Sequence, residues 1–242
     1  MKDIKITNIY DDYIFDDRLE TDHGISCLIE GLEKTILFDT GQHPEIFKRN
    51  IEKLGIDISK IDLVILSHSH YDHAGGFPHV AKTRKDLPVY IPDSFFNGFI
   101  KANPDYDRLL IIPIKQGIEI FSGTYSTGEA GSDRKEHSLL FKTDKGLVIV
   151  TGCAHQGLIE IIESVKSKFS ENIFLVVGGF HLCNMKESEF RTVINKVKEL
   201  KIKYVAPSHC TGKEAIKYFK KIFQETFIQT GAGKVIKLKE LM

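Results

Sequence analysis

The stretch Ile65–Phe77 reads ILSHSHYDHAGGF and places three histidines and one aspartate within six residues, His68 to His73. It continues an apolar run, IDLVILS, and the whole chain holds only ten histidines. Imidazoles this close repel one another once protonated, and they waste hydrogen-bonding capacity when neutral and dry. Neutral imidazole and carboxylate are natural ligands of a divalent cation, so the segment predicts a metal site.

The H-x-H-x-D-H spacing divides these donors into two pairs. Side chains two residues apart in an extended chain point the same way, so His68 and His70 can chelate one ion. If the chain then turns, Asp72 and His73 face a second direction, where a neighbouring ion can bind. Gly75 and Gly76 follow, and they allow the backbone to approach another segment without a Cβ clash.

Further metal-capable side chains follow the ends of other apolar strands. Five runs end in this way: TILF at Asp39, LVILS at His68, LVIVTG at Cys153 and His155, IFLVVGGF at His181, and YVAPS at His209. In layered α/β folds, sites collect at the carboxyl ends of strands because the loops there converge. We therefore expect these side chains to meet in space.

Composition places the chain among ordinary globular proteins. It has 242 residues, 42% hydrophobic and 27% charged, with 33 basic and 33 acidic side chains. We expect a single domain over residues 1–242. The balanced charge gives no reason to expect nucleic acid or a membrane as a partner. Three features favour a cytoplasmic protein: the charged segment MKDIKITNIYDDY, the lack of a long apolar run, and four cysteines without a C-x-x-C pair.

Residue patterns favour an α/β fold with four αββα layers. Strands are expected at 4–10, 25–30, 34–41, 61–67, 87–92, 109–114, 118–127, 173–179, 203–208 and 234–238, with a hairpin at 138–152. Helices are expected at 43–55, 157–169, 187–200 and 212–223, with a short one at 93–100. Each half of the chain has strands first and helix–strand alternation afterwards. Two sheets packed face to face with helices outside fit that order.

The region from Pro78 to Glu136 is expected to shape a substrate pocket. Its aromatic residues are sufficient for a wall against a flat ring, and the alternative is that they are ordinary core residues. These residues are Phe95, Phe96, Phe99 and Tyr106.

Four segments together resemble the metallo-β-lactamase superfamily: LFDTG, SHSHYDHAGG, VIVTGCAH and APSHCTG. They spread from about residue 24 to 212, and the resemblance implies an αββα sandwich with a dinuclear metal site. VTGCAHQGL, VVGGFHL and PSHCTG look most like the branch similar to 7,8-dihydropterin-6-methyl-4-(β-D-ribofuranosyl)aminobenzene 5′-phosphate synthase. That branch implies a small-molecule substrate that is phosphorylated or pterin-like.

The resemblance also implies roles for individual residues. Two divalent ions would be bound, with zinc the first choice and iron or manganese as alternatives. One would be held by His68, His70 and His155, and the other by Asp72, His73 and His209. Asp39 matches an aspartate that orients a ligand histidine. Asp72 would also orient the nucleophile.

Cys153 stands where many members have an aspartate that bridges the metals, so its thiolate is either a ligand or leaves that role to other groups. Many members place a ligand histidine upstream of that strand; His137 is the candidate, and we prefer His155. His181 is expected to contact substrate or donate a proton, or else to be a loop histidine. His23, His43 and His79 look isolated and receive no role.

These features favour a metal-dependent hydrolase that activates water for attack on a phosphorylated or ester-like small molecule. Three alternatives remain open. They are a di-iron redox protein, a non-catalytic metal-binding sensor, and a nuclease, which the neutral charge disfavours.

Overall fold

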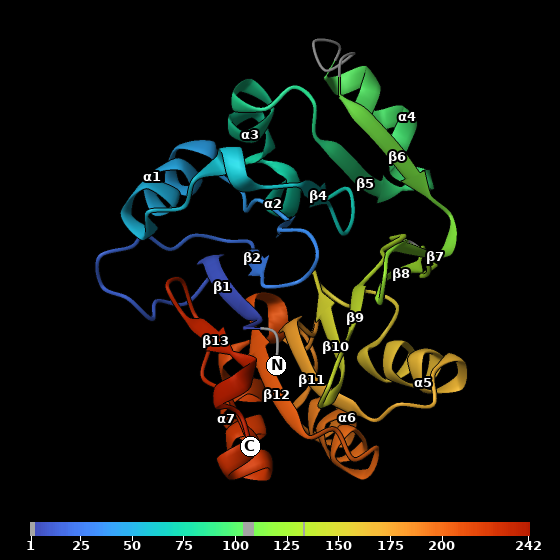
Figure 1. The fold of residues 1–242 in the computed structure, drawn as a ribbon. Helices are drawn as coiled ribbons and strands as arrows, with labels where there is room; N and C mark the ends of the chain where they lie inside the picture. Colours follow the sequence, from blue (N-terminus) through green and yellow to red (C-terminus); the bar gives the residue numbers. More distant parts are fainter. Residues whose placement is uncertain (1–2, 104–108, 133) are drawn as a thin grey trace.

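The computed structural model describes residues 3–103, 109–132 and 134–242, and its strands form two sheets (Figure 1). The seven-stranded sheet has the order β13-β1-β2-β3-β4-β5-β6. Its strands are β1 Lys5–Tyr10, β2 Ser26–Glu30, β3 Ile36–Phe38, β4 Leu63–Ile65, β5 Pro88–Pro92, β6 Leu110–Ile114 and β13 Val235–Lys237. The six-stranded sheet has the order β12-β11-β10-β9-β8-β7. Its strands are β7 Gln116–Phe121, β8 Thr124–Gly128, β9 Leu139–Thr143, β10 Gly146–Thr151, β11 Ile173–Gly179 and β12 Tyr204–Ser208.

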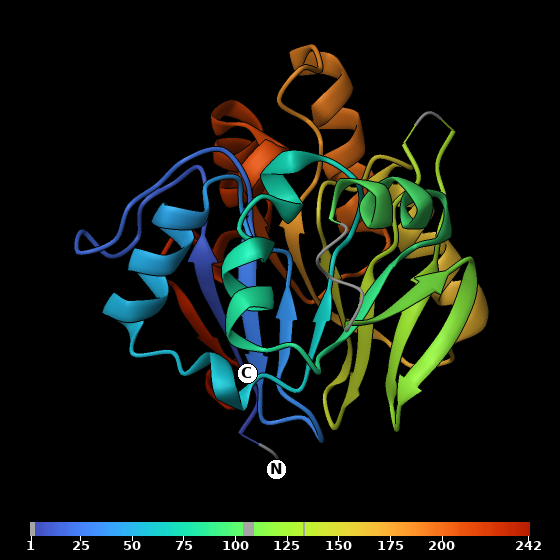
Figure 2. The same ribbon diagram turned by 90° about the horizontal axis from the view of Figure 1, so that it is seen from above.

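Seven α-helices accompany these strands in the described part of the chain. They are α1 Pro44–Leu54, α2 Tyr71–Ala74, α3 Phe77–Thr83, α4 Asp93–Ala102, α5 Leu158–Lys168, α6 Glu187–Glu199 and α7 Lys213–Phe223. In Figure 1 the blue and teal helices α1 and α3 lie above the strands, and the orange and red helices α6 and α7 lie below them; Figure 2 shows the molecule from above, with α1 and α3 in front. Short 3-10 turns lie at Ile58–Lys60, His209–Thr211, Gln224–Thr226 and Leu238–Glu240.

Three separate apolar clusters fill the spaces between the layers. One joins inward residues of both sheets, such as Phe38 and Phe141. The second packs α1, α3 and α4 on the outer face of the first sheet, and Phe47 is fully buried there. The third packs α5, α6 and α7 on the second sheet around Phe219. Three cores between four layers confirm the αββα sandwich.

Parallel pairing brings the strand ends to common edges. β3, β4, β5 and β6 run parallel in the first sheet, and β10, β11 and β12 run parallel in the second. The loops after β3 and β4 therefore leave one edge of the first sheet. The loops after β10, β11 and β12 leave one edge of the second, and these are the loops that carry the predicted donors.

The four longer predicted helices and the hairpin are confirmed. Gly55 ends α1 in the left-handed conformation with φ 67°, as its place after Leu54 indicates. The hairpin turns between Thr143 and Gly146, which pair across β9 and β10.

Three features were not predicted. The segment expected as a strand at 118–127 belongs to two strands, β7 and β8, which pair antiparallel across a turn at Ser122 and Gly123. The segment after His70 forms two helices, α2 and α3, and the last strand β13 pairs with β1 in the first sheet. A short periodic pattern cannot tell which sheet a terminal strand will join, because partner choice depends on contacts distant in sequence. No helix in the described ranges is long and apolar enough to cross a membrane.

Candidate metal centre

The quoted segment changes conformation in its middle, and this divides its donors. The chain is extended at His70, with φ −70° and ψ 144°, and α2 begins at Tyr71. A Cβ on Gly75 would lie 2.0 Å from the Gln42 carbonyl oxygen, and one on Gly76 would lie 2.2 Å from that of Thr40. Only glycine permits this approach, so α2 lies close to the loop after β3, as the spacing predicted.

Left-handed backbone conformations gather where the strands end. Among the described residues, six non-glycine residues have positive φ, and four of them lie here: Asp39 (54°), Ala154 (61°), His181 (51°) and His209 (46°). Such a conformation costs on the order of 1 kcal/mol or more at each position. It turns the chain sharply after β3, β10, β11 and β12.

The first donor group consists of His68, His70 and His155, whose ligand atoms lie within 4.8 Å of one another. The ring centroids of His68 and His155 are 4.6 Å apart, and those of His70 and His155 are 5.0 Å apart. Burial lowers the pKa of His68 well below its ordinary value, and burial with the nearby His155 lowers that of His70. His68 and His70 are therefore neutral, the form that binds a metal.

Glu136 holds the loop that carries His155, and sequence analysis missed it. Its Oε1 accepts hydrogen bonds from the Cys153 and Ala154 amides at 2.9 and 3.0 Å. Its Oε2 accepts from the amide of His155 at 3.0 Å and from the ring Nδ1 at 2.9 Å. The carboxylate is 1% exposed. Although burial opposes ionisation, the bonds from His155 and the backbone amides hold its pKa well below its usual range.

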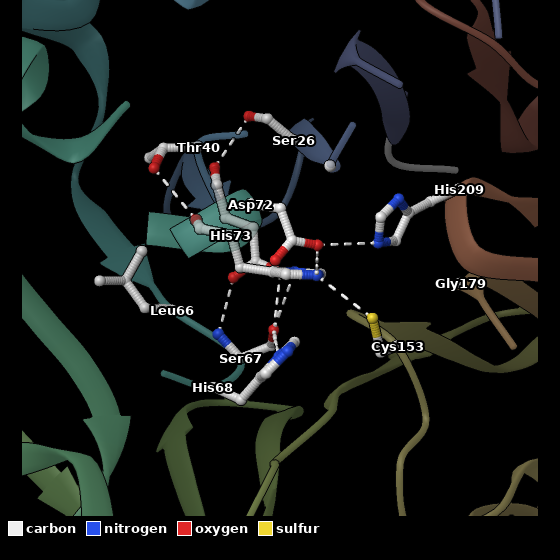
Figure 3. A network of polar contacts seen from close by, with 12 residues as sticks. Ser26, Thr40, Leu66, Ser67, His68, Asp72, His73, Cys153, Gly179 and His209 are labelled. Carbon is white, nitrogen blue, oxygen red and sulfur yellow. Dashed lines mark hydrogen bonds and ion pairs between the residues drawn. The ribbon is translucent and has the colours of Figure 1, made fainter. Parts of the chain in front are cut away.

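The second donor group consists of Asp72, His73, Cys153 and His209 (Figure 3). Asp72 Oδ2 lies 3.2 Å from the Nε2 atoms of both His73 and His209. The Cys153 Sγ lies 3.2 Å from His73 Nε2. Against the effect of burial, bonds from the two histidines hold the pKa of Asp72 well below its usual range.

Asp39 orients His73 through the ring Nδ1, on the side away from Asp72 and Cys153. Its Oδ1 accepts from the amide of Ser67 at 2.7 Å, and its Oδ2 accepts from Ser67 Oγ and from His73 Nδ1, both at 2.7 Å. Because the Ser67 hydroxyl proton goes to Asp39, its oxygen accepts from His68 Nδ1 at 2.9 Å. One buried carboxylate thus fixes the ring orientation of one histidine in each donor group.

Asp12 orients His209 in the same way, and sequence analysis missed this residue too. His209 Nδ1 donates to Asp12 Oδ1 at 2.6 Å. The other oxygen of Asp12 lies 3.0 Å from His23 Nδ1, and His23 Nε2 lies 3.5 Å from Asp72 Oδ2. The interpretation of His23 as isolated is therefore wrong, because its exposed ring lies beside His209, with centroids 4.8 Å apart.

His181 lies beside the first group, with its ring centroid 4.5 Å from that of His155. Its ring is exposed, and the Cys210 thiol beside it raises its pKa. His137 is buried away from the donors. Its Nδ1 lies 2.7 Å from Ser126 Oγ and its Nε2 lies 3.1 Å from the Leu66 carbonyl, so both ring nitrogens are already engaged.

The donor chemistry fits divalent ions. His68, His73, His155 and His209 each direct Nδ1 to an outer oxygen, on Ser67, Asp39, Glu136 and Asp12. Each therefore keeps Nε2 for the centre. The Nε2 atom of His68 is buried without a hydrogen-bond partner, and that of His209 faces Asp72 Oδ2 at 3.2 Å. An unpartnered buried nitrogen is costly, and a cation bound at His68 would remove that cost.

The predicted aromatic wall is only partly accounted for. Phe95 and Phe99 line a cavity of about 310 Å³ that Ser69 and Tyr71 also line. Phe96 packs against the core of the first sheet. Tyr106 lies outside the described residues.

Comparison with known proteins places this geometry in a family. A model of the metallo-beta-lactamase superfamily matches residues 22–151, which include the whole His68–His73 segment. The chain is 30% identical to the 7,8-dihydropterin-6-methyl-4-(beta-D-ribofuranosyl)-aminobenzene-5'-phosphate synthase of Methanocaldococcus jannaschii, over 97% of the chain and 96% of that protein.

Two further relatives span almost the same length. An uncharacterized protein of the same organism is 28% identical, over 88% of the chain and 93% of its own length. A crystal structure described as a metal-dependent hydrolase of the beta-lactamase superfamily has a TM-score of 0.81 and 27% identity, covering 97% of this chain and 99% of that one.

Proposed function

The chain belongs to the metallo-β-lactamase superfamily, and we propose that it binds two divalent metal ions and hydrolyses a phosphorylated or ester-like small molecule. His68, His70 and His155 would hold one ion. Asp72, His73 and His209 would hold the other, together with the Cys153 thiolate. Zinc is the first choice for this mixed nitrogen, oxygen and sulfur set, with iron and manganese as alternatives.

One observation carries this proposal. Four histidines direct Nδ1 to an outer oxygen and turn Nε2 toward a common centre, where the buried Nε2 of His68 has no partner. A purely structural cluster would instead use both ring nitrogens, as His137 does. When bound, divalent ions in such a site act as Lewis acids and lower the pKa of coordinated water to about 7.

The protein groups around the centre have distinct tasks. Asp72 faces His73 and His209 and orients the attacking water. His181, exposed beside His155, donates a proton to the leaving group. The oxygens that accept from Nδ1 of the histidines, such as those of Asp39 and Asp12, hold the imidazole rings in fixed orientations. The site therefore need not reorganise during the reaction.

A phosphorylated substrate is supported from two sides. The relative that covers nearly the whole chain is named as making a 5'-phosphate compound. In this chain, burial and the nearby His155 lower the pKa of His70, and the positive charge of the exposed Arg134 adds to this effect; a cationic side chain suits an anionic substrate group. The neutral net charge argues against nucleic acid as substrate.

A second candidate is group transfer to an acceptor other than water, because the relative is named a synthase. The two reactions would use the same donors. Product analysis separates them, since hydrolysis incorporates oxygen from labelled water into the product and transfer does not.

Metal analysis of purified protein followed by hydrolysis assays tests the proposal. We expect about two divalent ions per chain and turnover of at least one chromogenic phosphodiester, phosphomonoester, lactone or thioester, abolished by a chelator. Turnover that survives complete metal removal would refute it. Bound iron with a visible absorption band and redox activity would favour the di-iron alternative, and bound metal without turnover would favour a sensor.

A further inference from the structure

We propose that His23 is a further ligand of the ion in the second donor group, beside Asp72 and His209. This inference rests on the proposed function, because it adds a donor to the same centre. His23 is an exposed residue of the loop between β1 and β2. Together with Asp12 and His209 it forms a group of metal-capable side chains whose ligand atoms lie within 4.8 Å of one another.

The ring of His23 repeats the arrangement of the predicted ligand histidines. Its Nδ1 lies 3.0 Å from Asp12 Oδ2, and its Nε2 lies 3.5 Å from Asp72 Oδ2. The Nε2 atoms of His73 and His209 lie 3.2 Å from that same Asp72 oxygen (Figure 3). Three imidazole nitrogens therefore converge on one carboxylate oxygen, two from predicted ligands and the third from His23.

Hydrogen bonding explains why this arrangement suits a metal ion. When Nδ1 of a neutral imidazole donates to Asp12, the Nε2 atom of that ring can only accept. The ionised Asp72 carboxylate can also only accept. Two acceptors that face each other need a proton or a metal ion between them, and the ion of the second group is expected at this carboxylate. The Nε2 lone pair of His23 is directed toward the same place, where a neutral imidazole is a natural ligand.

The backbone beside His23 fixes the loop against the metal-binding segment. Asp12 Oδ1 accepts from the amide of Gly24 at 2.9 Å, so the carboxylate holds both the His23 ring and the residue after it. Gly24 has φ 129°, and a Cβ on it would lie 2.2 Å from the Asp72 carbonyl oxygen. Only glycine permits this approach, which brings His23 next to the segment that carries Asp72.

His23 also lies on a side of the centre that the other donors leave open. His73 is fully buried and Cys153 is 3% exposed, so both reach the ion from the protein interior. The His23 side chain is 56% exposed and would bind from the solvent side. The second ion would then have more protein donors than the first, which keeps a position for water.

Proton NMR of the cobalt-loaded protein tests this assignment without any need for turnover. Paramagnetic Co²⁺ strongly shifts the signals of protons on its ligands. A histidine that binds through Nε2 keeps a proton on Nδ1, which gives one shifted signal that disappears in deuterated water. We expect His23→Phe, which keeps an aromatic ring beside His209, to lose one such signal.

Metal affinity gives a second measurement on the same variant. Competition with a metal-sensitive dye should show that His23→Phe weakens binding of the second ion at least about tenfold, since even the partners of ligand histidines contribute that much. His23→Gln should give a similar loss, which excludes an effect of the phenylalanine itself.

His43→Phe is the matched control. His43 is another exposed histidine beside a carboxylate, since its Nε2 lies 3.1 Å from Asp22 Oδ2. Within the described residues it belongs to no group of metal-capable side chains. This variant should keep every shifted signal and the affinity of the parent protein.

An unchanged set of shifted signals in His23→Phe, or the same losses in His43→Phe, would overturn the assignment. Failure of the proposed function would look different. The parent protein would then bind two ions and lose one shifted signal in His23→Phe, yet it would turn over none of the substrates.

Discussion

The two donor groups at the centre differ in how they are held and in the charge they carry. His68, His70 and His155 form a set of imidazoles in which burial lowers the pKa of His68 and His70. The second set surrounds the Asp72 carboxylate. There, against the effect of burial, neighbouring carboxylates raise the pKa of His73 to about 9 and that of His209 well above its ordinary value.

This contrast teaches that the two halves of the centre start from different protonation states. In the first group, His68 and His70 are already neutral and ready to bind a cation. The second holds protons between its imidazoles and Asp72, and these protons occupy the place that a cation would take. Metal binding should therefore be linked to pH mainly through the second group.

Replacing one histidine from each group gives the largest expected effect. His70→Ala and His73→Ala should each lower kcat/KM by roughly 10³-fold, because a metal ion contributes several kcal/mol to transition-state stabilisation. Metal analysis should show that each variant loses an ion from its own group first. His79→Ala is a suitable control, since His79 contacts Phe47 away from the centre. If both variants keep two ions and full activity, the division into groups is wrong.

Replacing a carboxylate that contacts Nδ1 of a ligand histidine should show which ion that histidine helps to bind. Glu136→Gln should weaken binding of the ion at His155 by about 10–100-fold, and Asp12→Asn should do the same for the ion at His209. Competition with a metal-sensitive dye measures the two affinities. The same loss at both sites in both variants would contradict the separate orientation of each group.

Proton release on metal binding should show the same difference. His73 has a pKa of about 9, above its unfolded value of about 6.5. Below pH 9 it is mostly protonated and must release its proton to bind an ion, so affinity at the second group should rise with pH until about 9. Titration calorimetry in buffers of different ionisation enthalpy should detect this release, and none from His68 or His70. If protons were released on metal binding at the first group alone, the proposed difference between the two groups would be wrong.

Cys153→Ser gives the smallest expected effect. It removes a soft donor from the second group only and should lower zinc affinity there by roughly tenfold or less, with a smaller change for manganese. The burial and the contact with Cys210 that raise the thiol pKa partly offset the gain from a thiolate ligand. An unchanged zinc affinity would show that Cys153 lies beside the metal without binding it.

Sequence analysis could predict the layers and the strand-end donors because both depend on local pattern. Apolar runs, glycine at helix ends and the H-x-H-x-D-H spacing carry that information in short segments. The four-layer fold is confirmed, and the structure places all six predicted histidine and aspartate ligands in the two expected groups.

The orienting residues could not be found in this way. Glu136 lies in the charged stretch SDRKEH, which resembles a solvated surface segment. It is buried because Ala130 and Glu136 pair and direct its side chain under the loop of residues 153–155. Asp12 and His23 belong to the loop between β1 and β2, and they reach His209 only through long-range packing. An aspartate followed by a lone histidine carries no local signal of that contact.

Anomalous diffraction from crystals grown with zinc or manganese tests the central claim most directly. Two peaks are predicted, one bounded by His68, His70 and His155, and one by Asp72, His73 and His209. A map with no peak among these side chains, from protein that is folded and saturated with metal, would contradict the account.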